Sequence, residues 1–196
     1  MKKYEYKCIK CGDCCRAGLE ISIRKEDVLT WIQAEKDDFN SHIQIDPKSI
    51  SSEGLGGYHI EEENALLELL KRYGESKYKE KKKELEAFII NNHDYMGKGI
   101  VPLPIYTFIE HLGRMPILVP KNLQAVLEGM KWGIAYILKY QLNRFCPFQK
   151  ENLCSIHDIK PHDCKRFPYD EKGKLKTDPH ILKICKGISS LEEEEG

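Results

Sequence analysis

The chain has 196 residues, of which 41% are hydrophobic and 32% are charged, a composition that is typical of a globular protein and excludes a disordered one. Its 31 basic and 31 acidic residues balance, so no overall field attracts nucleic acid or an anionic membrane. Lys131 and Lys139 interrupt the longest candidate for a membrane span. The basic residues near the N-terminus precede no apolar run, which argues against a secretory signal. We therefore expect a cytoplasmic protein that binds neither nucleic acid nor membrane.

The N-terminal part of the chain begins with a compact cysteine loop over residues 1–18. Residues 19–23 alternate between apolar and polar side chains, which predicts a short strand. Residues 24–34 then predict a helix. Its apolar face is expected to carry Val28, Leu29 and Ile32.

The middle of the chain, residues 60–142, is predicted to be largely helical. Apolar residues at helical spacing indicate helices over 65–73 and 76–89. Four prolines within 97–120 favour extended segments there. The strongest helix is predicted to run from Asn122 to Leu138. Its face of small residues, which would allow another backbone to approach closely, comprises Ala125, Gly129 and Gly133.

The C-terminal part, residues 145–187, has short turns, cysteines and prolines, so we expect a cross-link to hold it. An acidic tail follows over 191–196. The predicted fold is α+β: one mainly helical metal-binding domain over 1–190 with short strands. In this fold the N- and C-terminal cysteine-rich segments are brought together around a metal centre.

The eight cysteines are the most informative feature of the sequence. None lies between Cys15 and Cys146. In a reducing compartment, clustered thiols bind metal more often than they form disulfides. The predicted metal-ligating residues are Cys8, Cys11, Cys14, Cys15, Cys146, Cys154, Cys164 and Cys185.

The first cysteine block reads CIKCGDCC, in which three cysteines are each separated by two residues. This spacing is that of bacterial ferredoxin loops, and Cys146-Pro147 supplies the remote cysteine before proline. It predicts an iron–sulfur cluster, of the 4Fe–4S type. Its expected ligands are Cys8, Cys11, Cys14 and Cys146. Zinc is the alternative, because thiolates also suit that ion, and a chain without metal stays open as a third possibility.

Several details of the cysteine arrangement stay open at this point. The adjacent Cys14 and Cys15 are expected to point in different directions, so one centre or two could be present. His157 and His162 stand at spacings from cysteines at which they could ligate or merely lie nearby. Basic residues outnumber acidic ones in the second block, and they are expected to lower the thiol pKa values.

These residues resemble the YkgJ-type cysteine-cluster family, which is described as a zinc- or iron-chelating domain. The family motif is a CxxCxxCC block followed by a distal block C-P-F…C-x-I-Y…R-P-x-x-C-R-x-F-P…C-x-G. All eight cysteines of this chain match it, and residues 19–28 resemble its strand-then-helix continuation. The chain departs from the motif where His157 replaces tyrosine, and where Lys160 and Lys165 replace arginines. Residues 40–140 lie outside the resemblance.

The resemblance implies a metal site, and three functions remain open. The first is an iron–sulfur or zinc protein with a redox or accessory role and a redox partner. The second is an S-adenosylmethionine-dependent protein lysine N-methyltransferase, because flagellin lysine-N-methylase has similar cysteine motifs. The third is a protein that hands iron or zinc to a protein client.

We also expect the two cysteine blocks to build one joint site. The first block has three suitably spaced thiols and needs a distant fourth, whereas the second is too widely spaced for a zinc knuckle. Closing so long a loop costs only a few kcal/mol, while structural zinc binds with roughly 10–16 kcal/mol.

Overall fold

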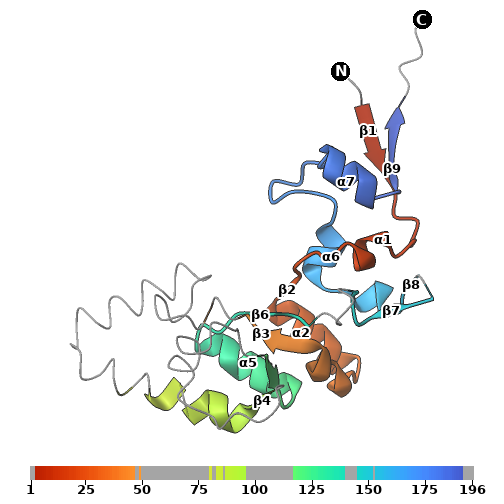
Figure 1. Ribbon diagram of the computed structural model, residues 1–196. Coiled ribbons are helices and arrows are strands. Elements are labelled where there is room, and N and C mark those ends of the chain that lie inside the picture. The colour runs from red at the N-terminus through yellow and green to blue at the C-terminus, as the bar shows by residue number, and fades with distance from the viewer. Residues whose placement is uncertain are drawn as a thin grey trace, which may run out of the picture. The chain divides into compact units, whose positions relative to one another are not determined.

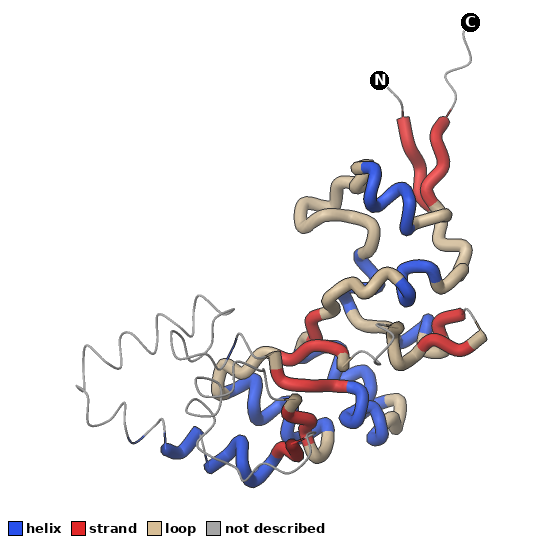
Figure 2. Tube along the Cα trace, in the orientation of Figure 1, coloured by secondary structure: helices blue, strands red, loops and turns tan. Residues whose placement is uncertain are grey.

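The computed structural model describes residues 3–46, 49, 80, 83–85, 87–95, 117–139, 145–151 and 153–191. Its packing defines two compact units where the sequence predicted one domain over 1–190. The terminal unit combines Met1–Ile21 with Leu138–Gly196, and the central unit is Ser22–Ile137. The described residues form helices and small antiparallel sheets, so the fold is α+β as expected (Figures 1 and 2).

The terminal unit joins the two ends of the chain in an antiparallel ladder. Strand β1 (Lys3–Tyr6) pairs with β9 (Ile188–Leu191), and the two strands lie side by side in Figure 1. A second ladder is a hairpin of β7 (Gln149–Lys150) and β8 (Leu153–Cys154). The helical elements of this unit are α1 (Asp13–Arg16), the 3-10 helix η3 (His157–Ile159), α6 (His162–Arg166) and α7 (Pro179–Ile184).

Local sequence signals explain where α7 begins and where the hairpin turns. The Asp178 carboxylate accepts hydrogen bonds from the backbone N–H groups of His180 and Ile181, and Pro179 occupies the first turn. In the hairpin, Glu151 adopts a positive φ of 48° between β7 and β8. The helix cap at Asp178 and the positive φ at Glu151 allow the second cysteine block to fold in short, tightly turned segments.

The central unit contains two small sheets. The three-stranded sheet has the order β2–β6–β3, and β4 pairs antiparallel with β5. Residues 83–85 and 87–92 are helical, which confirms this part of the helix predicted over 76–89. The remaining bounds are β2 (Ser22–Ile23), α2 (Lys25–Gln33), the 3-10 helix η1 (Asp37–His42), β3 (Ile43–Ile45), β4 (His93–Tyr95), β5 (Leu118–Pro120), α5 (Leu123–Lys131) and β6 (Tyr136–Leu138).

Helix α2 confirms the predicted helix but buries a different face. Val28 and Trp31 are fully buried, whereas Leu29 and Ile32 are exposed. The Trp31 ring packs edge-on against Phe39, with 5.4 Å between the ring centroids. Because the indole buries more apolar area than either aliphatic side chain, it determines which face of α2 turns inward.

Helix α5 is shorter than the predicted helix over 122–138. It ends at Lys131, and Gly133 then adopts a left-handed φ of 78°. The N–H of Ile134 donates to the carbonyl of Gly129 and that of Gly133 to the carbonyl of Met130, which is a Schellman cap. The chain turns there and enters strand β6.

Some expectations concern residues outside the described part of the chain. These are the helix over 65–73, the prolines before residue 117 and the acidic tail after Leu191. Among the residues that the structure describes, no helix has both the length and the apolar character needed to cross a membrane.

Candidate functional site

A cavity of about 70 Å³ in the terminal unit brings the two cysteine blocks together. All eight cysteines line it, although the blocks are far apart in the sequence. None of the eight forms a disulfide. Cys8 and Cys14 are exposed, while Cys146 and Cys185 are buried, so the cavity extends from the surface into the unit. The two blocks thus meet at one cavity, as the sequence predicted.

Backbone hydrogen bonds join the two blocks at two points. The N–H of Cys146 donates to the carbonyl of Cys15 over 2.9 Å, and the N–H of Lys7 donates to the carbonyl of Gly187 over 2.9 Å. A β-carbon on Gly187 would lie only 2.3 Å from the Lys7 oxygen. The second junction therefore depends on a residue without a side chain.

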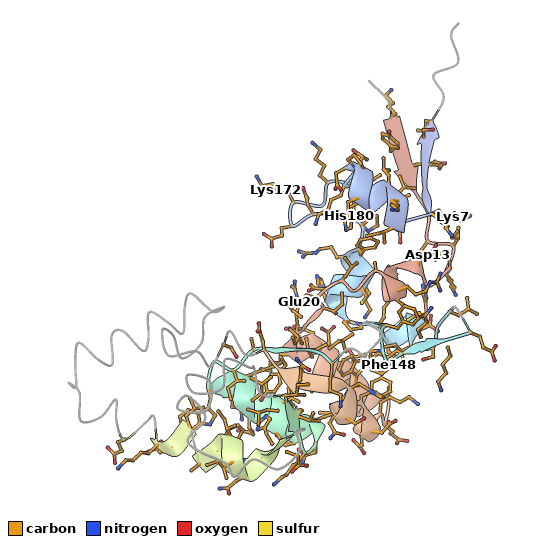
Figure 3. The ribbon with its side chains drawn as sticks, viewed as in Figure 1. Lys7, Asp13, Glu20, Phe148, Lys172 and His180 are labelled. Carbon is orange, nitrogen blue, oxygen red and sulfur yellow. The ribbon has the colours of Figure 1, made fainter. Side chains whose placement is uncertain are left out.

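An ion pair adds a third junction. The carboxylate of Asp13, at the start of α1, lies 3.0 Å from the ammonium group of Lys186, and it also accepts from the guanidinium of Arg16. The hydrogen bond from Lys186 is the largest cause of the lowered pKa of Asp13. Figure 3 labels Asp13 on α1 and Lys7, which directly follows strand β1. Asp13 thus connects the first cysteine block to the residue that follows Cys185.

The first block winds tightly before α1. Lys10 and Gly12 both have positive φ, 56° and 71°, and the N–H of Cys15 donates to the carbonyl of Gly12 over 3.0 Å. Cys14 and Cys15 therefore lie on one helical turn instead of in extended backbone. The expectation that their side chains point in different directions stays a prediction, because it assumed an extended backbone and the two residues lie in α1.

Four thiols influence one another's acidity most strongly. The thiols of Cys14, Cys146 and Cys154 are the three largest causes of the raised pKa of Cys15. We call these four residues the inner thiol group. It differs from the set expected from the ferredoxin spacing, because it contains Cys15 and Cys154 in place of Cys8 and Cys11. Which thiols bind metal stays a prediction.

The inner thiol group has unequal acidities. The hydrogen bond with Cys15 is the main cause that lowers the pKa of Cys14 to about 7, and the charge of Lys160 contributes. The pKa of Cys154 falls to about 6 through its hydrogen bond with Cys15, with Lys160 again contributing. The pKa of Cys146 is also lowered by Cys15. The same interactions raise the pKa of Cys15, so Cys15 keeps its proton while the three neighbouring thiols become more acidic.

Three other cysteines lie toward the β1–β9 end of the cavity. Burial raises the pKa of Cys185, and the charges of Cys14, Cys11 and Cys8 raise it further. We call Cys8, Cys11 and Cys185 the outer thiol group. Cys164 belongs to neither group: burial raises its pKa, and the charges that act on it are mainly those of the inner thiol group.

A histidine and a tyrosine face Cys8. The Nε2 atom of His157 lies 3.8 Å from the Cys8 sulfur. Burial raises the pKa of Tyr6, and a hydrogen bond with Cys8 adds to that shift. Of the two histidines singled out in the sequence, His157 lines the cavity and His162 does not.

The donor set suits a soft metal or an iron–sulfur cluster. Thiolates and one imidazole are ligands of zinc, copper(I) and iron–sulfur clusters, and the remaining lining is largely apolar, including Phe148, Ile156 and Phe167. As the side chains stand, no three Cys, His, Asp or Glu residues within the described ranges form a set that could hold a metal ion. Binding therefore requires thiols to rotate about their side-chain torsions toward the cavity.

Sequence reasoning missed three contributors to this site. Tyr6 and Asp13 were not singled out, and Lys160 was noted only as a replacement for arginine. The charges of Asp13 within the CxxCxxCC block and of Lys186 next to Cys185 were a usable signal, but their pairing depends on how the blocks fold together. The expectation that a basic residue lowers thiol pKa values is confirmed for Lys160.

The acidities predict selective alkylation of the metal-free, reduced chain. Because thiolates react and thiols do not, Cys154 and Cys14 should react with iodoacetamide down to about pH 6 and about pH 7, whereas Cys164 should stay unreactive at both. Short pulses of reagent followed by peptide mass spectrometry measure each site. Equal labelling of Cys154 and Cys164 near pH 7 would contradict the proposed hydrogen-bonded thiolates.

Comparisons of the chain with protein-family models, with curated proteins and with solved structures gave no match. The resemblance to the YkgJ-type cysteine-cluster family therefore rests on the cysteine motifs alone and stays a prediction.

Proposed function

We propose that the terminal unit is a metal-binding module that holds an iron–sulfur cluster through its clustered cysteines. The observation that carries this proposal is that eight free cysteines, from two blocks separated by the whole central unit, line one cavity. Free thiols in such proximity are typical of a reducing compartment, which favours a cytoplasmic location. A shared ligand set explains why both blocks are present.

The size of the cavity favours a cluster over a single ion. A cavity needs a volume of roughly 10–15 Å³ to hold one water molecule. About 70 Å³ therefore accommodates a group of several atoms. The apolar lining also favours a cluster, because it limits the access of water to the sulfur atoms.

The inner thiol group is the best-supported ligand set, because its four thiols act strongly on one another's pKa and the backbone N–H of Cys146 donates to the carbonyl of Cys15. Lowered pKa values keep Cys14, Cys146 and Cys154 ready as thiolates, which are the ligating form. The ammonium group of Lys160 offsets part of the negative charge. When bound, a cluster would supply one-electron transfer or a structural cross-link between the blocks.

Zinc is the alternative occupant, and metal handling is the second candidate function. The exposure of Cys8 and Cys14 favours handling, because an acceptor protein could reach these thiols and exchange ligands with them. The methyltransferase alternative is supported by the resemblance alone. A protein client or redox partner would have to approach the open side of the cavity.

Analysis of the full chain purified without oxygen tests the proposal. We expect iron and acid-labile sulfide in equal amounts together with a brown colour, because only a cluster contains inorganic sulfide. Zinc without sulfide would support the alternative occupant. A reduced chain that holds no iron and no zinc would contradict metal binding altogether. Titration with S-adenosylmethionine tests the methyltransferase alternative, for which we expect no heat of binding.

A further inference from the structure

We propose that the outer thiol group and His157 form a second site, which binds one tetrahedral ion of the zinc type beside the inner thiol group. This inference rests on the proposed function, because it divides the same eight-cysteine cavity into two sites. Three cysteines and one histidine are one of the usual ligand sets of structural zinc. The divided cavity would thus take a cluster or ion on Cys14, Cys15, Cys146 and Cys154, and a separate ion at the β1–β9 end.

The position of His157 is the first observation behind the second site. The imidazole comes from η3 in the second block, and its Nε2 atom lies 3.8 Å from the sulfur of Cys8 in the first block. A nitrogen and a sulfur this close, from segments so far apart in sequence, can share one ion after a small rotation of either side chain.

The other nitrogen of the ring provides a second, independent observation. The Nδ1 atom of His157 lies 3.6 Å from a carboxylate oxygen of Asp158. Histidines that ligate metals almost always direct their second nitrogen to a carboxylate, a carbonyl or water, which fixes the tautomer. Nδ1 thus lies on the side of Asp158, at a distance too long for a hydrogen bond, and Nε2 is the nitrogen that faces Cys8.

The backbone holds the outer thiol group together. The pairing of β1 with β9 places Tyr6 opposite Ile188, and the hydrogen bond from Lys7 to Gly187 follows directly after it. Cys8 and Cys185 are thus each within two residues of a fixed junction. The ion pair between Asp13 and Lys186 joins a residue two positions after Cys11 to the residue that follows Cys185.

The backbone junctions separate the two groups. Cys15 and Cys146 of the inner thiol group are joined by their own backbone hydrogen bond, whereas Cys8 and Cys185 flank the junction between Lys7 and Gly187. Two adjoining sites also account for seven of the eight thiols, which is more than one four-ligand centre can use.

The test compares the metal content of full-length variants purified without oxygen from cells supplied with zinc. His157→Ala should lose about one zinc ion per chain, and its iron and sulfide should stay unchanged. His157→Cys should keep the zinc, because a thiolate replaces the imidazole. His180→Ala is the matched control: this histidine of α7 is exposed and lies away from the cavity lining (Figure 3), so the metal content should not change.

A cobalt-loaded chain gives a second readout of the same site. Co²⁺ occupies zinc sites and its ligand-field absorption moves to longer wavelength when sulfur replaces nitrogen. We expect this shift in His157→Cys and not in His180→Ala. The second site is excluded if His157→Ala keeps all its zinc and the cobalt spectrum of His157→Cys equals that of the unchanged protein. It is also excluded if the unchanged protein holds a cluster and no zinc. A wild-type chain without any metal would instead overturn the proposed function itself.

Discussion

Replacing Cys15 with serine is expected to remove the iron and sulfide from the purified chain. The pKa of Cys15 depends mainly on the thiols of Cys14, Cys146 and Cys154, and its backbone carbonyl accepts the hydrogen bond from the N–H of Cys146. Loss of its thiol therefore removes one ligand of the inner thiol group. Since structural metal sites contribute roughly 10 kcal/mol or more, the terminal unit should also unfold at a lower temperature.

The matched control for this variant is Cys8→Ser. Cys8 belongs to the outer thiol group, so its loss should leave the cluster in place. The ferredoxin spacing predicts the opposite, because it makes Cys8 a ligand and leaves Cys15 out. A Cys8→Ser protein without cluster, beside a Cys15→Ser protein that keeps it, would establish the set expected from the sequence and exclude the inner thiol group as ligands.

The two tryptophans allow the units to be followed separately. Trp31 and Trp132 both lie in the central unit, so tryptophan fluorescence reports on that unit, whereas calorimetry of the whole chain also records the transition of the terminal unit. In Cys15→Ser, the tryptophan transition should stay where it is while the other transition moves to a lower temperature. A shift of both transitions would show that the two units unfold together.

The cysteine pattern predicted that the two blocks meet because ligand chemistry depends on residue type and spacing, which the sequence states directly. It did not predict which residues join the blocks. The backbone has positive φ angles at Lys10 and Gly12, and the carbonyl of Cys15 accepts the hydrogen bond from Cys146 of the second block. Lys10 carries no sequence signal for such a turn, because a residue other than glycine rarely adopts it.

Helix α5 in the central unit also shows what the sequence could and could not predict. The periodic apolar residues predicted the start of α5 at Asn122, whose side chain accepts a hydrogen bond from the Ala125 N–H. They also extended the helix through Gly133, because Ile134 and Leu138 continue the helical spacing. The glycine instead closes the helix in a left-handed conformation, and the apolar residues beyond it are buried in and beside a strand. Apolar spacing alone does not distinguish these outcomes.

Replacing Gly187 with alanine is expected to destabilise the terminal unit by about 2 kcal/mol or more and to loosen the outer end of the cavity. The new β-carbon would lie 2.3 Å from the Lys7 oxygen and 3.3 Å from the Tyr6 ring. Because the nearest atom belongs to the backbone, a side-chain rotation cannot relieve the contact. The strand that carries Tyr6 must move away, and the hydrogen bond between Lys7 and Gly187 is lost with it.

Gly173→Ala is the control that separates this clash from the general cost of replacing a glycine. Gly173 has a φ of 75°, and a β-carbon added there would meet no atom of the described residues within 4 Å, so alanine should cost about 1 kcal/mol through backbone strain alone. Urea unfolding followed by cluster absorption gives the stability of the terminal unit, and zinc per chain gives the occupancy of the outer site. We expect Gly187→Ala to lose zinc and Gly173→Ala to keep it. If both variants keep zinc and lose the same stability, the junction at Lys7 does not position Cys8 and Cys185.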